Sequence, residues 1–254
     1  MWDPAVYRRF GSERSRPFFD LVRQIGAERP RTVVDLGCGP GELTRTLADR
    51  WPGARVVGVD SSPEMIGKAS ADPGPVEFRL GDIADWEPTP DVDVVVTNAA
   101  LQWVPGHQEM LTRWTRGLPA GAWIAMQVPG NFASPGHRAV WDLASSADLR
   151  DDVELRDDPV DDAQGYAELL TAAGATVDAW ETTYLHLLPV EPEQDHPVLR
   201  WMEGTALRPV RAALSDGEWT AFRATLAERI AVEYPERHGL VAFPFRRIFV
   251  VAST

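Results

Sequence analysis

Cysteine and lysine are nearly absent from this chain of 254 residues. Cys38 is the single cysteine, which excludes an internal disulfide and predicts a reducing, cytoplasmic compartment. Lys68 is the single lysine among 25 basic residues. Any anion site must therefore rely on arginine, whose guanidinium group suits carboxylates and phosphates.

Long apolar runs and excess positive charge are also missing. The sequence has no run of about 18 apolar residues, and Met1 is followed at once by Trp2-Asp3-Pro4, so we predict neither a membrane span nor a signal peptide. The formal net charge of −13 argues against general binding to nucleic acid or to an anionic membrane. An acidic small molecule would need a local cluster of arginines.

A glycine-rich stretch near the start of the chain carries the strongest signal. A run of apolar, β-branched residues ends in Asp35, and Gly37, Gly39 and Gly41 follow before a helical pattern begins. This predicts a buried strand that turns tightly into a helix, with side chains removed so that a ligand can approach the backbone. Cys38 lies inside the turn, where a small side chain is needed, so we interpret it as a packing residue and not as a nucleophile.

The glycine spacing separates two kinds of nucleotide site. A dinucleotide fingerprint requires G-x-G-x-x-G, whereas the glycines here alternate and position 42 is glutamate. The spacing therefore argues against a nucleotide-dependent oxidoreductase.

Polar residues end the strands that we predict after the glycine turn. Asp60 ends a strand over 56–60, about 20 residues on, where such folds place a carboxylate for ribose hydroxyls. Asp82 follows a strand over 76–80, Asn98 ends one over 92–98, and Gln127 lies near the end of one over 122–128. Because ligands bind beyond the carboxyl ends of parallel strands, we expect these residues to gather with Gly37.

The alternation of strands and helices over 31–128 predicts an α/β fold with a doubly wound, mainly parallel sheet. Further strands over 177–187 and 243–252 bring the total to seven. We assign 1–133, 161–190 and 239–254 to the core, and 134–160 and 191–238 to a small helical cap formed by two insertions. Such caps enclose small substrates and exclude water.

Aromatic and cationic residues over 2–16 suggest a flap over the site. The acidic stretch over 148–162 is interpreted as a solvated surface loop.

The motif Asp35-Leu36-Gly37-Cys38-Gly39-Pro40-Gly41 resembles the first motif of Rossmann-like class I S-adenosylmethionine-dependent methyltransferases. Segments along nearly the whole chain resemble the trans-aconitate 2-methyltransferase family in particular. They are Trp2-Asp3-Pro4, Glu13-Arg14-Ser15-Arg16-Pro17, Asp60-Ser61-Ser62-Pro63-Glu64-Met65-Ile66, Asn98-Ala99-Ala100-Leu101-Gln102-Trp103-Val104-Pro105, Leu207-Arg208-Pro209 and Ala242-Phe243-Pro244. Residues 134–160 match that family less clearly.

The resemblance implies S-adenosyl-L-methionine as cofactor and assigns roles to residues. Asp60 would bind the ribose, Asp82 and Ile83 would frame the adenine, and the glycine loop would lie under the methionine part. The implied cofactor set is Asp35, Gly37, Cys38, Gly39, Gly41, Asp60, Ser61, Met65, Asp82, Ile83, Asn98, Leu101 and Trp103. The implied reaction forms a monomethyl ester on one carboxylate of trans-aconitate, a small polycarboxylate.

Carboxyl methylation needs no general base, because a carboxylate with a pKa near ~4 is already ionised at neutral pH. Orientation of oxygen against methyl supplies most of the acceleration, so we expect positioning residues only and no metal. Candidates for binding the acceptor are Arg208, Arg246, Arg247, Tyr184, Gln127, Arg14 and Arg16. His107 and His186 are the best placed histidines, and for both we favour a structural role.

Three alternatives stay open. The acceptor could be a different small or carrier-bound acid, although we find no basic docking face for an acidic carrier. Methylation of an amide or base nitrogen is disfavoured, because Asn98-Ala99-Ala100-Leu101 lacks the Asn/Asp-Pro-Pro-aromatic pattern of such enzymes. The domain could also be a nucleotide-binding module without catalytic activity.

Overall fold

The structure is a computed structural model that describes residues 15–146, 160–204 and 206–254, apart from the side chains of Ser146 and Arg208. The predicted N-terminal flap, with Arg14, and most of the acidic stretch lie outside the described residues. The strands are β1 (Thr32–Leu36), β2 (Arg55–Asp60), β3 (Val76–Leu80), β4 (Val92–Asn98), β5 (Trp123–Pro129), β6 (Thr176–Pro189), β7 (Glu236–Arg237) and β8 (Leu240–Ser253).

The helices alternate with the strands as far as β5, and after it they occur in groups. They are α2 (Arg16–Val22), α3 (Glu42–Arg50), α4 (Pro63–Ala71), α5 (His107–Gly117), α6 (Pro135–Ser146), α7 (Ala163–Ala172), α8 (Pro197–Glu203), α9 (Arg208–Ala213) and α10 (Asp216–Glu233), with short 3₁₀ turns η1 (Ile83–Asp85) and η2 (Leu101–Trp103). Among the described helices, none combines the length and apolar character needed to cross a bilayer.

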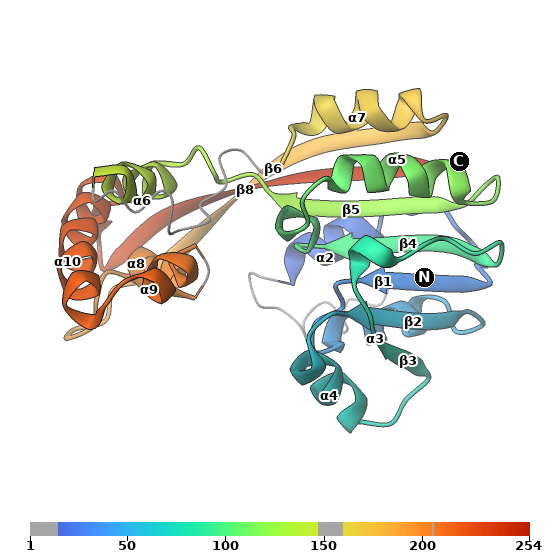
Figure 1. Ribbon diagram of the computed structural model, residues 1–254, viewed down its shortest axis with the longest axis horizontal. Helices are drawn as coiled ribbons and strands as arrows, with labels where there is room; N and C mark the ends of the chain where they lie inside the picture. Colours follow the sequence, from blue (N-terminus) through green and yellow to red (C-terminus); the bar gives the residue numbers. More distant parts are fainter. Residues whose placement is uncertain (1–14, 147–159, 205) are drawn as a thin grey trace. The chain divides into compact units, whose positions relative to one another are not determined.

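The sheet has the order β3-β2-β1-β4-β5-β8-β6, and β7 pairs with β8 (Figure 1). The pairs β1–β2, β1–β4, β2–β3 and β4–β5 are parallel, whereas β8 runs antiparallel to β5. The predicted doubly wound, mainly parallel sheet is therefore confirmed, with eight strands among the described residues instead of the predicted seven because the two-residue β7 pairs with β8. Strand order reverses at β1, where β2 lies on one side and β4 on the other, and open sheets of this kind bind ligands at that point.

Two compact units divide the described chain. The sheet unit holds the residues up to Pro129 with Val160–Thr182 and Arg247–Thr254, and the helical unit holds those between Gly130 and Pro159 with Thr183–Arg246. This division differs from the predicted core and cap at 130–133 and Val160 and, more extensively, over 183–190 and 239–246. The reason is that β6 and β8 are each 14 residues long and run on into the helical unit, where Leu188, Val241 and Phe243 join its core.

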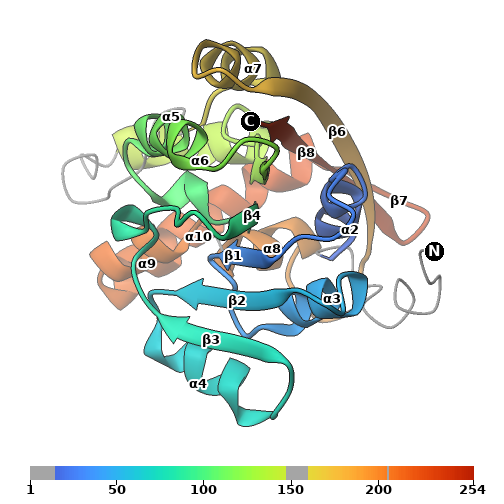
Figure 2. The ribbon, with the colours of Figure 1, turned by 90° about the vertical axis from the view of Figure 1, so that its right-hand side faces the viewer.

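Within the sheet unit, all five residues of β1 are buried, as expected of a strand covered on both faces. Helix α3 packs on β2, α4 packs on β3 and α5 packs against α7. Helix α4 lies beside β3 at one edge of the sheet, and α7 lies beside β6 at the other (Figure 1, Figure 2). Helix α2 packs on β5 and ends at Val22, and Gly26, four residues further on, lies against the ring of Trp123.

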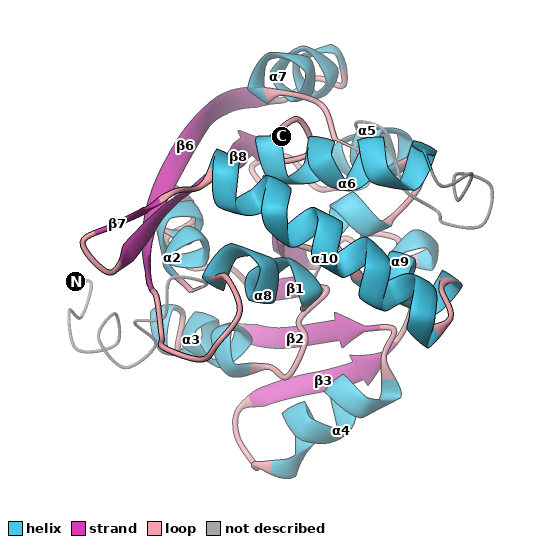
Figure 3. Ribbon diagram, turned by 90° about the vertical axis from the view of Figure 1, so that its left-hand side faces the viewer, coloured by secondary structure: helices cyan, strands magenta, loops and turns pink. Residues whose placement is uncertain are grey.

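The helical unit has its own hydrophobic core. Helix α10 packs against α6 and α8 (Figure 3). Its start is fixed by a capping box between Ser215 and Glu218, and Leu226 and Ile230 are fully buried. Helix α6 begins at Pro135, a residue suited to the first helical turn, and it contributes Ala139, Val140 and Ala144 to the core.

Candidate cofactor and acceptor site

The glycine loop leaves the end of β1 in a conformation that favours glycine. The φ values are +81° at Gly37 and +55° at Gly39, in the left-handed region. Gly37 and Cys38 donate their backbone N–H groups to the carbonyl of Val59, at 2.8 and 3.1 Å. A β-carbon on Gly39 would meet no atom of the described residues within 4 Å. The backbone at Gly39 therefore borders open space that a ligand can approach.

Asp60 ties this loop to the end of β2. Its Oδ2 accepts the backbone N–H of Gly39 and its Oδ1 accepts that of Ser62, both at 2.9 Å. Ser62 caps α4 by accepting the backbone N–H of Met65, which is half-buried, while Ser61 is exposed beside it. The structure thus brings together the carboxylate and the glycine loop that the sequence predicts to share a ligand.

Asp35 is a buried carboxyl group beneath the loop. It is 3% exposed, and the hydroxyl of Thr44 donates to its Oδ2 at 2.6 Å. Burial raises the pKa of Asp35 to about 6; the bond from Thr44 opposes the rise and repulsion by Asp60 adds to it. Asp35 is therefore mostly ionised at neutral pH and becomes protonated as the pH falls through about 6.

Cys38 is buried, and burial together with the nearby Asp35 and Asp60 carboxylates raises the pKa of its thiol. A reactive cysteine needs the opposite, because the thiolate is the nucleophile. Its sulfur would lie 3.0 Å from a β-carbon on Gly58 in β2. These observations support packing as its role.

The third strand end brings Asp82 and Ile83 to the loop. Asp82 is exposed and caps η1 by accepting the backbone N–H of Ala84 at 2.9 Å. Ile83 is buried, and its Cδ1 would lie 3.4 Å from a β-carbon on Gly37. An apolar side chain and a carboxylate thus flank the loop.

The turn after β4 is strained and held by two hydrogen bonds. Ala99 has a φ of +54°, which is uncommon for a residue with a side chain. Its N–H donates to the backbone carbonyl of Gln127 at 2.9 Å, and its carbonyl accepts Nε2 of Gln102 at 2.7 Å. Gln102 lies in the motif over 98–105, but its burial beside a strained turn could be found only from the structure. Leu101 is fully buried in this segment, whereas Trp103 is 60% exposed.

Comparisons with known proteins agree with this geometry. A family model described as a methyltransferase domain matches residues 33–121. A trans-aconitate 2-methyltransferase from Mycolicibacterium gilvum is 57% identical and covers 99% of this chain and 98% of its own. One from Rhodococcus jostii is 54% identical over 100% of this chain and 99% of its own.

The chain belongs to the trans-aconitate 2-methyltransferase family. The fold alone is shared more widely. The structure of the YcgJ protein from Bacillus subtilis matches with a TM-score of 0.59 at 13% identity, over 94% of this chain and 98% of that one. The predicted class I, Rossmann-like fold is thereby confirmed.

The residues predicted to bind the methyl acceptor of this methyltransferase belong to both units. Gln127 and Arg247 lie in the sheet unit and are 1% and 9% exposed. Tyr184 and Arg246 lie in the helical unit, where Tyr184 is buried and Arg246 donates its backbone N–H to Asn131 Oδ1 at 2.7 Å.

The remaining predicted arginines are less informative. Arg208 begins α9, but its side chain is not among those described. Arg16 begins α2, and its side chain is 59% exposed and lies 3.6 Å from the carboxylate of Asp20. This ion pair is the ordinary surface arrangement for an arginine one turn before an aspartate.

The two histidines have structural surroundings. His107 is 1% exposed; its Nδ1 lies 3.1 Å from the carbonyl of Val104, and its Nε2 lies 2.7 Å from the hydroxyl of Tyr166. Since a carbonyl only accepts, a neutral ring carries its proton on Nδ1, and its Nε2 accepts a hydrogen bond from the Tyr166 hydroxyl. His186 stacks on Trp201, with ring centroids 5.3 Å apart, in the aromatic cluster of the helical unit.

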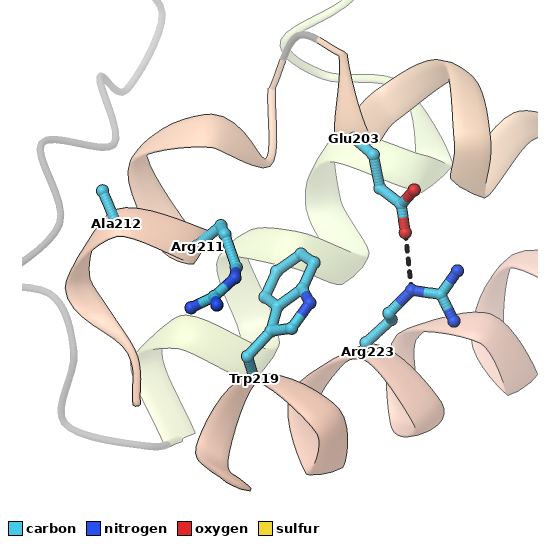
Figure 4. Close-up of a pocket in the computed structure, with 5 residues that line it drawn as sticks. All are labelled: Glu203, Arg211, Ala212, Trp219 and Arg223. Atoms are coloured by element: carbon cyan, nitrogen blue, oxygen red, sulfur yellow. Dashed lines mark hydrogen bonds and ion pairs between the residues drawn. The ribbon is translucent and has the colours of Figure 1, made fainter. Parts of the chain in front are cut away.

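A pocket of about 480 Å³ opens among α8, α9 and α10 of the helical unit. It is lined by Glu203, Arg211, Ala212, Trp219 and Arg223 (Figure 4). Its arginines already have carboxylate partners: Arg223 Nε lies 2.5 Å from Glu203 and Nη2 lies 2.6 Å from Asp195, and Arg211 pairs with Asp216. Both guanidinium groups are thus paired with carboxylates, and none of the predicted site residues whose side chains the structure describes lines the pocket.

Proposed function

We propose that this methyltransferase transfers the methyl group of S-adenosyl-L-methionine to a carboxylate of trans-aconitate and forms a monomethyl ester. The observation that carries the proposal is identity of 57% over essentially the whole length of a relative with that name. The small-molecule acceptor also agrees with the net charge of −13, which disfavours a nucleic acid. We further propose a cytoplasmic location, consistent with the single cysteine.

The residues at the strand ends fit the proposed cofactor. The open backbone at Gly39 would accommodate the methionine part, while Asp82 and the apolar Ile83 would border the adenine. Each oxygen of Asp60 accepts one backbone N–H and keeps a second lone pair, so the carboxylate retains acceptors for two ribose hydroxyls. Asn98 to Trp103 would border the sulfonium, and the acidic Asp35 and Asp60 would stabilise its positive charge.

The proposed chemistry requires alignment but no proton transfer by the protein. When bound, the cofactor supplies an electrophilic methyl group; its C–S bond breaks as a C–O bond to the carboxylate forms, and S-adenosylhomocysteine leaves. The carboxylate attacks in its ionised form, so no base is needed. The arginines proposed to bind the methyl acceptor, which include Arg247, would hold the other carboxylates of the substrate, so that one carboxylate oxygen faces the methyl group.

The experiment that tests this function is methyl transfer from labelled S-adenosylmethionine to a panel of trans-aconitate, cis-aconitate, citrate and isocitrate, scored as base-labile methanol. Saturable labelling that favours trans-aconitate is the expected result. Labelling of none of the four, with cofactor binding intact in calorimetry, would overturn the proposed acceptor and leave the family assignment unchanged.

A further inference from the structure

Gln127 on β5 buries its amide without a hydrogen-bond partner among the described residues. The side chain is 1% exposed, and neither Nε2 nor Oε1 is bonded. An unpartnered amide removed from water lowers the stability of the protein, and native structures contain few such groups. Packing of the fold does not account for this one.

The register of the sheet places Gln127 on one face together with polar side chains of the neighbouring strands. Gln127 pairs with Asn98 on β4, and the neighbouring strand β8 presents Phe249 to Gln127 and Arg247 to Pro129. Paired residues, and residues two apart on one strand, share a face of the sheet. Asn98, Gln127 and Arg247 therefore lie on one face of the sheet, near the carboxyl ends of β4 and β5. Asn98 Oδ1 is also buried and has no hydrogen bond among the described residues.

Polar residues also lie on this face in the strands on the other side of β4. Asp35 pairs with Gly58 on β2 and with Val96 on β4, so Asp35, Asp60 and Asn98 share the same face. In strand order β2, β1, β4, β5 and β8, this face carries two carboxyl groups, two amides and a guanidinium. All of these residues belong to the sheet unit.

This gradient of charge matches the two reactants of the proposed reaction. A sulfonium is cationic and is stabilised over the carboxylates, whereas the acceptor is anionic and is stabilised beside Arg247. The two amides lie between the carboxylates and Arg247. A neutral side chain suits this position, because a cation there would repel the sulfonium and an anion would repel the anionic substrate. We propose that Gln127 is an acceptor-binding residue whose Nε2 donates to the carboxylate that is methylated, and that it holds this carboxylate beside the methyl group. The inference rests on the proposed function.

Two substitutions at Gln127 test the role. Q127E keeps the shape and adds a negative charge, so we expect the acceptor KM to rise about tenfold or more, with unchanged or tighter cofactor binding in calorimetry. The effect should decrease as the pH falls and the new carboxylate is protonated. Q127M keeps the volume and removes the unbonded amide; its Tm should be no lower than that of the wild type, although its acceptor KM also rises.

Thr97 offers a matched control. Its hydroxyl is also buried and unbonded in the described structure, but strand alternation places it on the opposite face of β4. T97V should keep the wild-type acceptor KM and a Tm no lower than that of the wild type.

The outcomes separate this inference from the function on which it rests. Wild-type turnover of a polycarboxylate with unchanged acceptor KM in Q127E and Q127M overturns the role of Gln127 alone. A rise in cofactor Kd for Q127E, with acceptor KM unchanged, also overturns it and assigns the amide to the cofactor side. A wild-type enzyme that binds cofactor but methylates none of the panel overturns the proposed function and this inference with it.

Discussion

Gly37 and Ala100 approach so closely that a β-carbon on Gly37 would lie 2.4 Å from the β-carbon of Ala100. Gly37 follows β1 and Ala100 follows β4, so the contact joins the two strands between which the strand order reverses. Neither carbon belongs to a flexible side chain. The glycine at position 37 is thus required both by its φ of +81° and by its neighbour.

We predict that Gly37→Ala destabilises the protein by on the order of 2 kcal/mol or more and abolishes cofactor binding, because backbone strain and overpacking act together. Denaturant unfolding and calorimetry measure the two effects. Combining it with Ala100→Gly should recover part of the stability, because that change removes the colliding carbon. Gly67→Ala, in α4 with open space around it, is the control and should be neutral or slightly stabilising. If the double variant recovers no stability, the predicted clash between the two β-carbons is wrong.

Asp60→Ala should weaken the binding of S-adenosylmethionine at least about a hundredfold, since it removes acceptors of charge-assisted hydrogen bonds and frees the loop at Gly39. Calorimetric titration provides the measurement. Asp49→Ala removes an exposed carboxylate from α3 and is the matched control. Wild-type affinity in Asp60→Ala would contradict the ribose assignment.

Asp35 should make cofactor affinity depend on pH. Its pKa of about 6 means that it is ionised at pH 8 and mostly protonated at pH 5. A cationic ligand favours the ionised form, so we expect the affinity for S-adenosylmethionine to fall about tenfold between pH 8 and pH 5. S-adenosylhomocysteine lacks the sulfonium charge and should show a smaller dependence, as should the Asp35→Asn variant. Equal pH profiles for both ligands would contradict the interaction.

The same carboxyl group should contribute to the pH dependence of stability. The pKa is raised in the folded state from 3.8 to about 6, so between these values the folded protein binds more protons than the unfolded chain. Stability therefore falls as the pH rises through this window, by up to about 3 kcal/mol for a shift of this size. Urea unfolding of wild type and Asp35→Asn at pH 4.5 and 7.5 tests the sign: the variant should be less sensitive to the change.

Tyr166→Phe should reduce stability by about 1–3 kcal/mol without changing kcat, because it leaves Nε2 of His107 and the backbone N–H of Asp161 without their partner. Thermal unfolding and steady-state kinetics measure both quantities. A selective loss of kcat at unchanged stability would show that His107 acts in the reaction and would contradict its structural role.

The candidate cofactor site could be predicted largely from the sequence. A tight turn needs glycine, and buried strands that end in acids or amides can be recognised from a few adjacent residues. The parallel order of the strands then brings Gly37, Asp60, Asp82 and Asn98 to one edge. These patterns involve residues close together in the sequence, so they can be recognised without the structure.

Features that depend on distant segments required the tertiary structure. The strain at Ala99 arises from bonds to Gln102 and Gln127, and the lengths of β6 and β8 depend on side chains that pack among the helices of the helical unit. The contact between Gly26, which follows α2, and Trp123 of β5 likewise joins segments far apart in the sequence.

The sequence by itself determined the family, the glycine turn and the polar residue at each strand end, because these follow from local backbone preference and the period of buried residues. Only the tertiary structure decided that Asp60, Asp35, Asn98, Gln127 and Arg247 share one face of the sheet, with the acids and the base on opposite sides of the amides in strand order. The physical reason is register: hydrogen bonds between strands far apart in the chain set which face each side chain occupies, and a shift of one residue would reverse it.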